Sequence, residues 1–517
     1  MKSSVQSQDD VIAFLSDPRS YGMDAGVEIH ETHGSLVFLA GAHAYKLKRS
    51  IRFPYMDYST GEKRRVMCQR ELAVNRRMAP ALYENLLAVV RDGPLLRFGA
   101  PDDPNAVDWV VVMRRFAQSD LLEARRAAGR LTREDVLALA DAVAGFHKSA
   151  ERVEGWGGSQ GIRAVIDESV SLLGEARAGE EFAVEVRRFA ELAEHRLTSV
   201  RDVLGWRRQN GFVRRCHGDL HLNNVCMVDG APVLFDAIEF NDAFCCIDVL
   251  YDLAFLLMDL DRHGLRDHAN ALFNRYLERS GDYSGLGALP LFLACRASIR
   301  AHVAVSTLQT ASVGSADPLE PRRLLDAAIS YLEPRRPELI VIGGLSGTGK
   351  STIARLLAPG IGAAPGAVVL RSDVVRKMMM GVPVTQKLDE SAYDLRTNAA
   401  VYERLYATAG SVLRAGHSVI VDAVFGHADE RSQIESVARD SAVEFHGVWL
   451  TAERTVLESR IAQRTADASD ATVAVLRRQI ESIAEPTHWT KIAAEGTPAQ
   501  ILSTIEWAIG LGAKMAV

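Results

Sequence analysis

The sequence predicts two kinds of fold in one chain: a mixed α+β part, then an α/β part whose parallel sheet is covered by helices. In the first part, short runs of alternating apolar and polar residues precede a long region with helical periodicity. In the second part, strand-like and helix-like segments alternate from residue 338 onward. A glycine-rich stretch, GGLSGTGKST, follows the first strand of this second part.

The composition is that of a soluble globular protein with several domains. The chain has 517 residues, 48% hydrophobic and 24% charged, and we expect about two to four domains. The net charge of -6 leaves no basic excess to neutralise a nucleic-acid backbone, so nucleic acid is not an expected partner. The start lacks the apolar core of a signal peptide, no uninterrupted apolar run is long enough to span a membrane, and the six cysteines have no regular spacing. We therefore expect a cytoplasmic protein with reduced thiols.

The N-terminal part is predicted to begin with a small sheet. Residues 27–50, VEIHETHGSLVFLAGAHAYKLKRS, alternate apolar and polar side chains and contain two turn signals, which predicts three antiparallel strands. A helix capped by Ser59 or Thr60 follows, and then two strand-like runs, ALYENLLAVVRD and DWVVVMRRF. From Leu131 to about Leu204 the pattern is helical.

Proline and charged residues mark a joint between the two parts. We predict a first domain at residues 1–330, with a small lobe at about 25–116 and a helical lobe at about 117–330. A linker at 331–337 and a second domain at 338–517 complete the predicted organisation.

The stretch CHGDLHLNNV, residues 216–225, contains the first group of candidate catalytic residues. Asp219 and Asn224 are five positions apart, and Asp236 ends the apolar run VLF further along the chain. Phosphoryl transfer from ATP needs metal ions on the phosphates, a lysine to hold them and a carboxylate to take the acceptor proton. The protein-kinase catalytic loop supplies an Asp and an Asn at this spacing, with a metal-binding Asp on the next strand. A polar turn between a helix and a strand is the alternative.

This stretch resembles the aminoglycoside phosphotransferase and choline kinase branch of the protein-kinase-like fold, over roughly residues 25–330. The resemblance implies that Asp219 is the catalytic base and that Asn224 and Asp236 bind magnesium. It implies structural roles for His217 and for Asp252, which with Asp248 matches the family's Asp-x-x-x-Asp-Leu-Ala pattern. The sequence departs from the family at Leu222-Asn223 and by an extra residue before Glu239, which leaves Glu239 open as a metal neighbour or a solvated acid.

The predicted small sheet should supply the phosphate-holding lysine. Lys46 and Lys48 lie on one face of the same strand, and alignment with the preceding turn favours Lys46. Its partner on the helix should be a glutamate, with Glu71 favoured over Glu62. VVVMRRF resembles the hinge between kinase lobes, which implies that backbone groups of Met113 and Arg114 meet adenine.

GGLSGTGKST has the spacing of a P-loop and lies between a predicted strand and a helix. Its backbone N–H groups would surround phosphates, Lys350 would reach the β and γ phosphates, and Ser351 would bind magnesium. The residues expected to contact the nucleotide are Gly344, Ser346, Gly347, Thr348, Gly349, Lys350, Ser351 and Thr352.

Two later strands of the C-terminal part carry further candidates. HSVIVDAVF ends in Asp422, the expected Walker B metal ligand, and AVVLRSDVVRK places Asp373 and Arg376 after a strand. The arrangement resembles gluconate and shikimate kinases and the zeta-toxin and polynucleotide-kinase group. That resemblance implies that Asp373 receives the acceptor hydroxyl and Arg376 grips an anionic part of the acceptor. A plain strand-end turn is the alternative.

RIAQRTADASDA places Arg460 and Arg464 on one helical face. They resemble the lid arginines of these kinases, which stabilise charge on the transferring phosphoryl group, although a solvated helix face would look the same. His427 and Arg431 are further candidates for acceptor contacts.

These motifs together predict a bifunctional phosphotransferase that uses ATP, with GTP as the alternative, and Mg²⁺. Each domain would act on a hydroxyl of a small molecule such as a sugar or amino sugar. Three alternatives remain at this stage: one active kinase regulated by nucleotide in the other domain, a nucleotide-dependent regulatory protein, and a nucleic-acid end kinase. The acceptors and the oligomeric state stay open.

Overall fold

A computed structural model describes residues 7–24, 26–53, 55–175, 180–310, 317–463 and 468–510. The chain divides into two compact units, one formed by residues 1–161 and 208–256 and the other by residues 162–207 and 257–517. The predicted linker at 331–337 falls inside the second unit, and the predicted domain boundaries stay a prediction.

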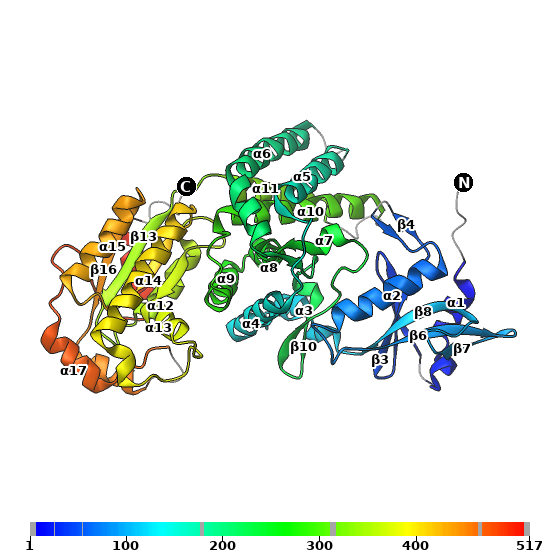
Figure 1. Cartoon of the computed structure of the whole chain (residues 1–517), viewed down its shortest axis with the longest axis horizontal. Coiled ribbons are helices and arrows are strands. Elements are labelled where there is room, and N and C mark those ends of the chain that lie inside the picture. Colours follow the sequence, from blue (N-terminus) through cyan, green and yellow to red (C-terminus); the bar gives the residue numbers. More distant parts are fainter. Residues whose placement is uncertain are drawn as a thin grey trace. The chain divides into compact units, whose positions relative to one another are not determined.

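The first unit contains a six-stranded antiparallel sheet, with helix α2 (Gly61–Asn75) packed on it (Figure 1). Thr60 caps this helix by accepting the N–H of Lys63, as the sequence predicted. The three predicted strands at the start are present, as are the two later ones. The order across the sheet is β1 (Glu28–Glu31), β2 (Ser35–Ala40), β3 (His43–Lys48), β8 (Ala106–Arg114), β6 (Tyr83–Asp92) and β7 (Leu95–Gly99).

Sequence reasoning missed several short elements of this unit. They are helix α1 (Asp9–Ser16), strand β7 and a hairpin of two-residue strands, β4 (Arg52–Phe53) and β5 (Met56–Asp57). The candidate catalytic loop lies between two short strands, β9 (Val213–Arg215) and β10 (Val225–Val228), each of which pairs with another short strand. Strand β9 pairs with β12 (Cys246–Asp248) and β10 with β11 (Ala231–Leu234), and these strands are accompanied by α3 (Leu122–Ala127), α4 (Arg133–Ser149), α7 (Asp242–Cys245) and α8 (Val249–Arg262).

The second unit joins a group of helices to a five-stranded parallel sheet in the order β14-β15-β13-β16-β17. Helices α12 and α18 pack on the sheet through a shared apolar core. The strands are β13 (Glu338–Gly344), β14 (Val368–Arg371), β15 (Val419–Asp422), β16 (Glu444–Thr451) and β17 (Thr490–Ala493), the last of which was not predicted. The helices around them are α12 (Lys350–Leu357), α13 (Ser372–Met379), α14 (Leu395–Arg414), α15 (Ala428–Asp440), α16 (Arg454–Ala462), α17 (Val473–Ser482) and α18 (Pro498–Ala508).

The remaining helices of the second unit are α5 (Gly158–Gly174, which begins in the first unit), α6 (Glu180–Gln209), α9 (Arg266–Ser280), α10 (Leu289–Thr310) and α11 (Glu320–Leu332). Helix α9 carries two asparagines that meet strand β14, the edge strand of the parallel sheet. Asn274 accepts the N–H of Val369 at 2.7 Å and donates to the carbonyl of Ala367 at 3.2 Å, and Asn270 donates to the same carbonyl. Asn274 thus bonds to two backbone groups of this edge, the N–H of Val369 and the carbonyl of Ala367.

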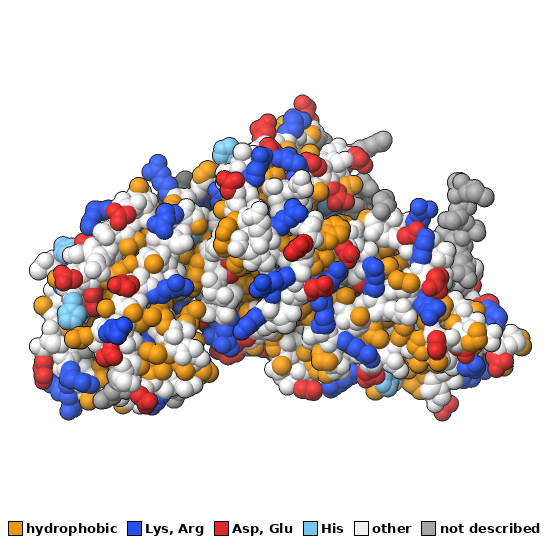
Figure 2. Space-filling view, viewed as in Figure 1, with side chains coloured by type: hydrophobic (Ala, Val, Ile, Leu, Met, Phe, Trp, Pro, Cys, Tyr) orange, Lys and Arg blue, Asp and Glu red, His pale blue; other side chains and the backbone are white. Residues whose placement is uncertain are grey.

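One helix among the described residues, Leu286–Leu308, is long and apolar enough to cross a membrane by length and composition. Of its most apolar window, 72% is buried inside the protein, which is the pattern of a core helix. The sequence reasoning did not single out this segment. On the face drawn in Figure 2, basic and acidic side chains are interspersed and neither kind gathers into one large patch.

Candidate active sites

Lys46 lies at the centre of the first candidate site. It is on β3, and its ammonium donates to Glu71 of α2 at 2.8 Å and to the carboxylate of Asp236. Lys46 and Glu71 are buried, whereas the side chain of Asp236 is 41% exposed. A buried lysine beside an accessible carboxylate is placed to meet the phosphates of a nucleotide whose metal ion that carboxylate could bind.

Lys48, two residues along the same strand, also binds Glu71. Its ammonium donates to the second carboxylate oxygen of Glu71 at 2.6 Å and to Glu239, which also accepts the hydroxyl of Tyr58 at 2.7 Å. Glu239 is therefore neither a solvated acid nor an open metal neighbour in this structure, because it pairs with Lys48 in the interior. We call Asp236, Lys46, Glu71, Lys48 and Glu239 the ion-pair ladder.

Three buried members of the ladder, Lys46, Glu71 and Lys48, stay charged because each has opposite charges beside it. Burial raises the pKa of Glu71, but the ammonium groups of Lys46 and Lys48 outweigh it and lower that pKa to about 2. Burial also lowers the pKa of Lys46, yet Asp236 and Glu71 together raise it well above its ordinary value. Both lysines are thus cations at neutral pH, and only Lys46 contacts the exposed carboxylate.

Asp219 and Asn224 meet within the loop, as their spacing predicted. The amide nitrogen of Asn224 donates to the backbone carbonyl of Asp219 at 2.8 Å and to its carboxylate at 3.1 Å. Because that nitrogen faces Asp219, the amide oxygen of Asn224 is the atom that can face a cation. The carboxylate of Asp219 is 41% exposed, so it is accessible to an acceptor.

Asp236 adopts a backbone conformation that non-glycine residues rarely use. Its φ is 62°, in the left-handed region where Asp and Asn are enriched. The conformation is held by two neighbouring bonds: Asp236 donates its N–H to the hydroxyl of Tyr83, and Ala237 donates its N–H to Asn75 of α2. This turn directs the carboxylate toward Lys46.

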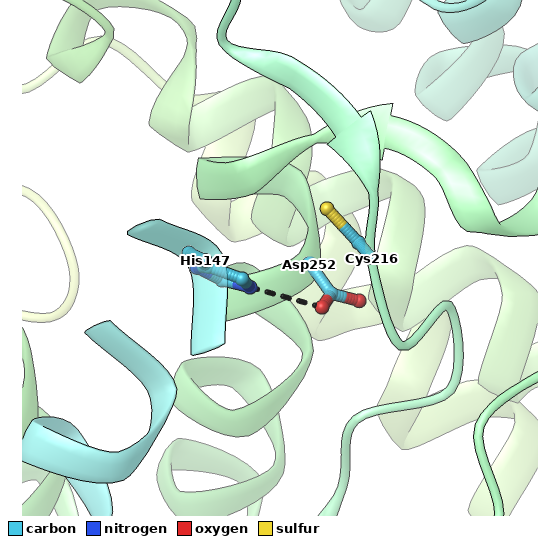
Figure 3. Close-up of side chains that lie close together, drawn as sticks. All are labelled: His147, Cys216 and Asp252. Carbon is cyan, nitrogen blue, oxygen red and sulfur yellow. Dashed lines mark hydrogen bonds and ion pairs between the residues drawn. The ribbon is translucent and has the colours of Figure 1, made fainter. Parts of the chain in front are cut away.

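Asp252 of α8 holds the catalytic loop from below. Its two carboxylate oxygens accept the backbone N–H groups of His217 and Gly218, at 3.0 and 2.8 Å. His147 of α4 contacts the same carboxylate at 3.1 Å, and Cys216 lies beside it (Figure 3). These three side chains could supply metal ligands, but the carboxylate is already engaged by the loop. We assign Asp252 the structural role that the sequence resemblance implied.

The predicted hinge residues lie at the end of β8. Met113 pairs with Ala44 and Tyr83 in the sheet. The N–H of Arg114 donates to the carbonyl of Leu82 at 2.8 Å, so this group is engaged within the sheet. An adenine contact at Met113 stays a prediction.

The second candidate site is the loop between β13 and α12, and its glycines are required by space. Gly344 has a φ of 135°, and a Cβ there would lie 2.6 Å from the carbonyl oxygen of Leu450. Gly347 has a φ of 89°, and its Cβ would meet the carbonyl of Leu457 at 2.9 Å. The loop therefore follows the path expected of a P-loop, with Ser346, Thr348, Gly349 and Thr352 along it.

Lys350 and Ser351 begin helix α12 directly after this loop. The ammonium of Lys350 donates to the carbonyls of Gly344 and Leu345, at 2.9 and 3.0 Å, so it lies over the loop. The hydroxyl of Ser351 lies 2.5 Å from the carboxylate of Asp422, at the end of β15. A hydroxyl and a carboxylate in contact form the hard oxygen donor set that Mg²⁺ prefers, so both predicted ligands fit this ion.

Asp373 and Arg376 lie on α13, which follows β14. Burial and the nearby Asp422 raise the pKa of Asp373, while Ser469 hydrogen-bonds its carboxylate. Arg376 donates to the carbonyl of Ala392 and to Asn398, at 2.8 and 2.7 Å, and is itself buried. Asp373 is therefore placed beside the metal-ligand candidate. Arg376 is engaged with the segment that precedes and begins α14.

Two of the predicted lid and acceptor residues, Arg460 and Arg431, bind backbone carbonyls. Arg460 of α16 donates to the carbonyl of Ala494 at 2.8 Å, and Arg464 lies outside the described residues. Arg431 donates to the carbonyls of Phe425 and Gly426, and His427 precedes α15 as its N-cap. The structure thus brings Lys350, Ser351, Asp422 and Asp373 together, and leaves the lid residues as predictions.

Comparison with known proteins decides the family. Residues 339–486 match the family described as "AAA domain" (AAA_33). A protein of Mycobacterium tuberculosis, "Uncharacterized protein Rv2004c", is 30% identical over 459 residues, which cover 87% of this chain and 88% of the relative. The chain belongs to the Rv2004c family.

Solved structures similar to this member of the Rv2004c family include kinases. A choline/ethanolamine kinase family protein from Mesorhizobium loti is 16% identical, covers 63% of this chain and 94% of its own, and has a TM-score of 0.41. A gluconokinase from Sinorhizobium meliloti is 23% identical, covers 35% of this chain and 95% of its own, and has a TM-score of 0.25. The predicted order of a mixed α+β part and a parallel sheet covered by helices is confirmed, and the second part matches a P-loop family model. The protein-kinase-like architecture of the first part stays a prediction.

Sequence reasoning missed two residues at the P-loop site of this Rv2004c-family chain. Gln479 of α17 accepts the N–H of Ser346 at 2.9 Å, which places it on an amide of the phosphate-binding loop. Asp470 accepts bonds from Lys377, from Tyr393 and from the N–H of Leu388, and so ties the segment before α14 to the segment before α17. Gln479 belongs to no motif, and Asp470 lies in the stretch RIAQRTADASDA, where only the arginines were singled out; the fold brings both residues to the site.

Proposed function

We propose that the chain is a bifunctional, ATP- and magnesium-dependent phosphotransferase whose two sites each transfer a γ-phosphoryl group to a hydroxyl of a small molecule. The observation that carries this proposal is Lys46, buried on Glu71 and in contact with the exposed carboxylate of Asp236. Phosphoryl transfer in kinase-like folds requires a lysine held by a glutamate beside a metal-binding aspartate. The P-loop site adds Lys350 with Ser351 and Asp422.

In the first site, Lys46 would bind the phosphates of ATP, and Asn224 and Asp236 would hold Mg²⁺. When bound, the metal would neutralise charge on the β and γ phosphates. Asp219 would accept the proton of the attacking hydroxyl. Its backbone carbonyl and carboxylate are both oriented by Asn224, so the base and the metal-ligand candidate are positioned together.

In the second site, the loop amides and Lys350 would surround the phosphates, with Ser351 and Asp422 as metal ligands. Asp373 would take the proton from the acceptor hydroxyl. Burial and Asp422 raise its pKa, which favours proton acceptance by a carboxylate. Arg376, Arg460 and Arg464 would contact anionic groups of the acceptor or of the transferring phosphoryl group.

One observation favours the regulatory alternative, in which nucleotide in one site controls the other. Helix α9, which lies in the predicted first domain, bonds to β14 through Asn270 and Asn274. β14 leads directly into α13, which carries Asp373. A contact this close to the second site is a physical route by which one part could influence the other.

Calorimetry with a non-hydrolysable ATP analogue and Mg²⁺ tests the proposal. The full chain should bind about two analogues, Lys350→Ala should bind one, and Lys350→Ala combined with Lys46→Met should bind none. The same titration with a GTP analogue gives the base preference. A stoichiometry of one that survives Lys350→Ala would refute nucleotide binding by the P-loop. We further propose a cytoplasmic location and small-molecule acceptors, without nucleic acid or membrane partners.

A further inference from the structure

A cavity of about 660 Å³ lies where the β4–β5 hairpin meets the start of α2 and the chain after Asp236. This volume is in the range of small-molecule sites. The residues that line it are Arg52, Phe53, Tyr55, Met56, Asp57, Tyr58, Lys63, Met67 and Phe240. All belong to the first compact unit.

Partly exposed aromatic rings form one side of the cavity. The ring planes of Phe53 and Tyr55 are only 10° from parallel, with centroids 5.7 Å apart, and His33 stacks on Phe53 at 4.4 Å. The ring centroid of Phe240 lies 6.4 Å from that of Tyr55. None of the four rings is buried. Partly exposed parallel ring faces are suited to pack against a flat ring, either aromatic or the apolar face of a sugar.

The charged side chains of the cavity carry one excess positive charge. Lys63 binds Asp57 at 2.6 Å, and Arg52 lies 3.5 Å from the same carboxylate oxygen. Two cations thus share one anion, and the side chain of Arg52 is 64% exposed. An anionic group of a ligand could bind Arg52 without displacing Lys63 from Asp57.

The cavity is close to the ion-pair ladder. Tyr58, one of its buried walls, donates its hydroxyl to Glu239, and the next residue, Phe240, is another wall. Phe240 follows Asp236 by four residues, so their Cα atoms are at most about 14 Å apart. The cavity also lies near the loop of the candidate base: the ring centroid of Tyr55 is 6.2 Å from that of Phe244, and a Cβ on Gly218, the residue before Asp219, would lie 2.8 Å from the carbonyl oxygen of Phe244.

We propose that this cavity recognises the acceptor of the first site, and that the acceptor is a hydroxyl-bearing ring compound with a phosphate or carboxylate group. The acceptor role rests on the proposed function. In the reaction, the acceptor oxygen forms a bond to the γ-phosphorus while the bond from that phosphorus to the β–γ bridging oxygen breaks. ADP takes the bridging oxygen with its electron pair, and the hydroxyl proton goes to Asp219.

Two anionic ring compounds distinguish the two kinds of ring. Glucose 6-phosphate presents a sugar face and pyridoxine 5′-phosphate an aromatic ring, and glucose and pyridoxine serve as uncharged controls. Calorimetry with the full chain should show binding of at least one phosphorylated compound, and at least tenfold weaker binding of its uncharged parent. Phe53→Ala and Arg52→Glu should each weaken it at least tenfold. Leu95→Ala, a control at an exposed site on β7 of the six-stranded sheet, should leave it unchanged.

The proposal is overturned if neither phosphorylated compound binds or if binding survives both cavity substitutions. The same proteins titrated with the ATP analogue separate this result from the proposed function. Phe53→Ala and Arg52→Glu should retain the wild-type nucleotide stoichiometry. Ring binding without any nucleotide binding would refute the kinase and, with it, the acceptor role of the cavity. Nucleotide binding without ring binding would refute the cavity alone.

Discussion

The carboxylate of Asp252 accepts the backbone N–H of Gly218 at 2.8 Å, one residue before the candidate base Asp219. Gly218 has a φ of 87°, and a Cβ there would meet the carbonyl of Phe244 at 2.8 Å, so no other residue fits this turn without strain. The position of the base, which lies in a loop, thus depends on a side chain of helix α8.

Asp252→Ala should therefore lower transfer at the first site with a smaller effect on nucleotide binding. Loss of the carboxylate leaves two buried N–H groups without this acceptor, at a cost of about 1–3 kcal/mol each. We expect at least a hundredfold drop in kcat, measured with labelled ATP, and a change of a few fold in the affinity for the ATP analogue. Asp202→Asn, an exposed change on α6, is the control. Unchanged kcat in a folded Asp252→Ala protein would contradict the positioning role.

Substitutions of Lys46 and Lys48 can show which of these two lysines binds the phosphates, a question that the sequence left open. Both bind Glu71, but only Lys46 contacts the exposed Asp236. Lys46→Met should abolish transfer at the first site and weaken binding of the ATP analogue at least tenfold. Lys48→Met should mainly lower the free energy of unfolding, because it leaves Glu239 buried without its cation. The reverse result would make Lys48 the phosphate-binding residue.

The charge of Glu71 should increase the free energy of unfolding at neutral pH, and this contribution should be lost in acid. Its pKa is about 2 in the folded protein against an ordinary 4.5, so its contribution is complete above pH 4.5 and is lost as the pH falls from 4.5 toward 2. The change corresponds to about 3 kcal/mol. Urea unfolding should show a difference between wild type and Glu71→Gln that shrinks below pH 4.5. Glu62→Gln, on the exposed side of the same helix, is the matched control, and it should change the free energy of unfolding little at neutral pH.

Asp219 and Asp236 should separate catalysis from nucleotide binding. Asp219→Asn should abolish transfer at the first site while the affinity for the ATP analogue changes little, because Lys46 and Asp236 remain. Asp236→Ala should instead weaken binding of the analogue with Mg²⁺. Calorimetry and turnover on an identified acceptor measure the two effects. Near-full turnover of Asp219→Asn would show that another group is the base.

Lys350→Ala should remove the P-loop reaction and leave most transfer by the first site, and Asp219→Asn should do the converse. Each set of candidate residues lies within its own segment of the chain, so neither site requires a side chain from the other. Both variants should be assayed with both acceptors and checked by circular dichroism. Loss of both reactions in one folded variant would favour the regulatory alternative.

The elements predicted from the sequence are those whose signal is local. The alternation of residues 27–50 gives three strands, Thr60 is visible as a helix cap, and a P-loop requires glycines that can be counted. The β4–β5 hairpin was missed because each of its strands has only two residues, too few to show a period. Strand β17, with four residues, was also missed.

The candidate sites divide in the same way. Asp219, Asn224 and Asp236 could be found from their spacing, and Lys46 with Glu71 from the order of strand and helix. The partner of Lys48 is Glu239, 191 positions away, and no local pattern connects them. Asp470 and Gln479 reach the second site only through the packing of the segments that carry them. These residues become visible only when the tertiary contacts are known.

The contact between Asn274 and β14 bears on what happens if the chain is cut at residue 338. A fragment that starts there would lose helix α9, and the N–H of Val369 and the carbonyl of Ala367 would face water. An uncovered strand edge can pair with the same edge of another copy, which is how many truncated sheet proteins aggregate. In the full chain, the two asparagines thus occupy backbone groups through which two copies could pair. The fragment should precipitate or form oligomers at concentrations at which the full chain does not.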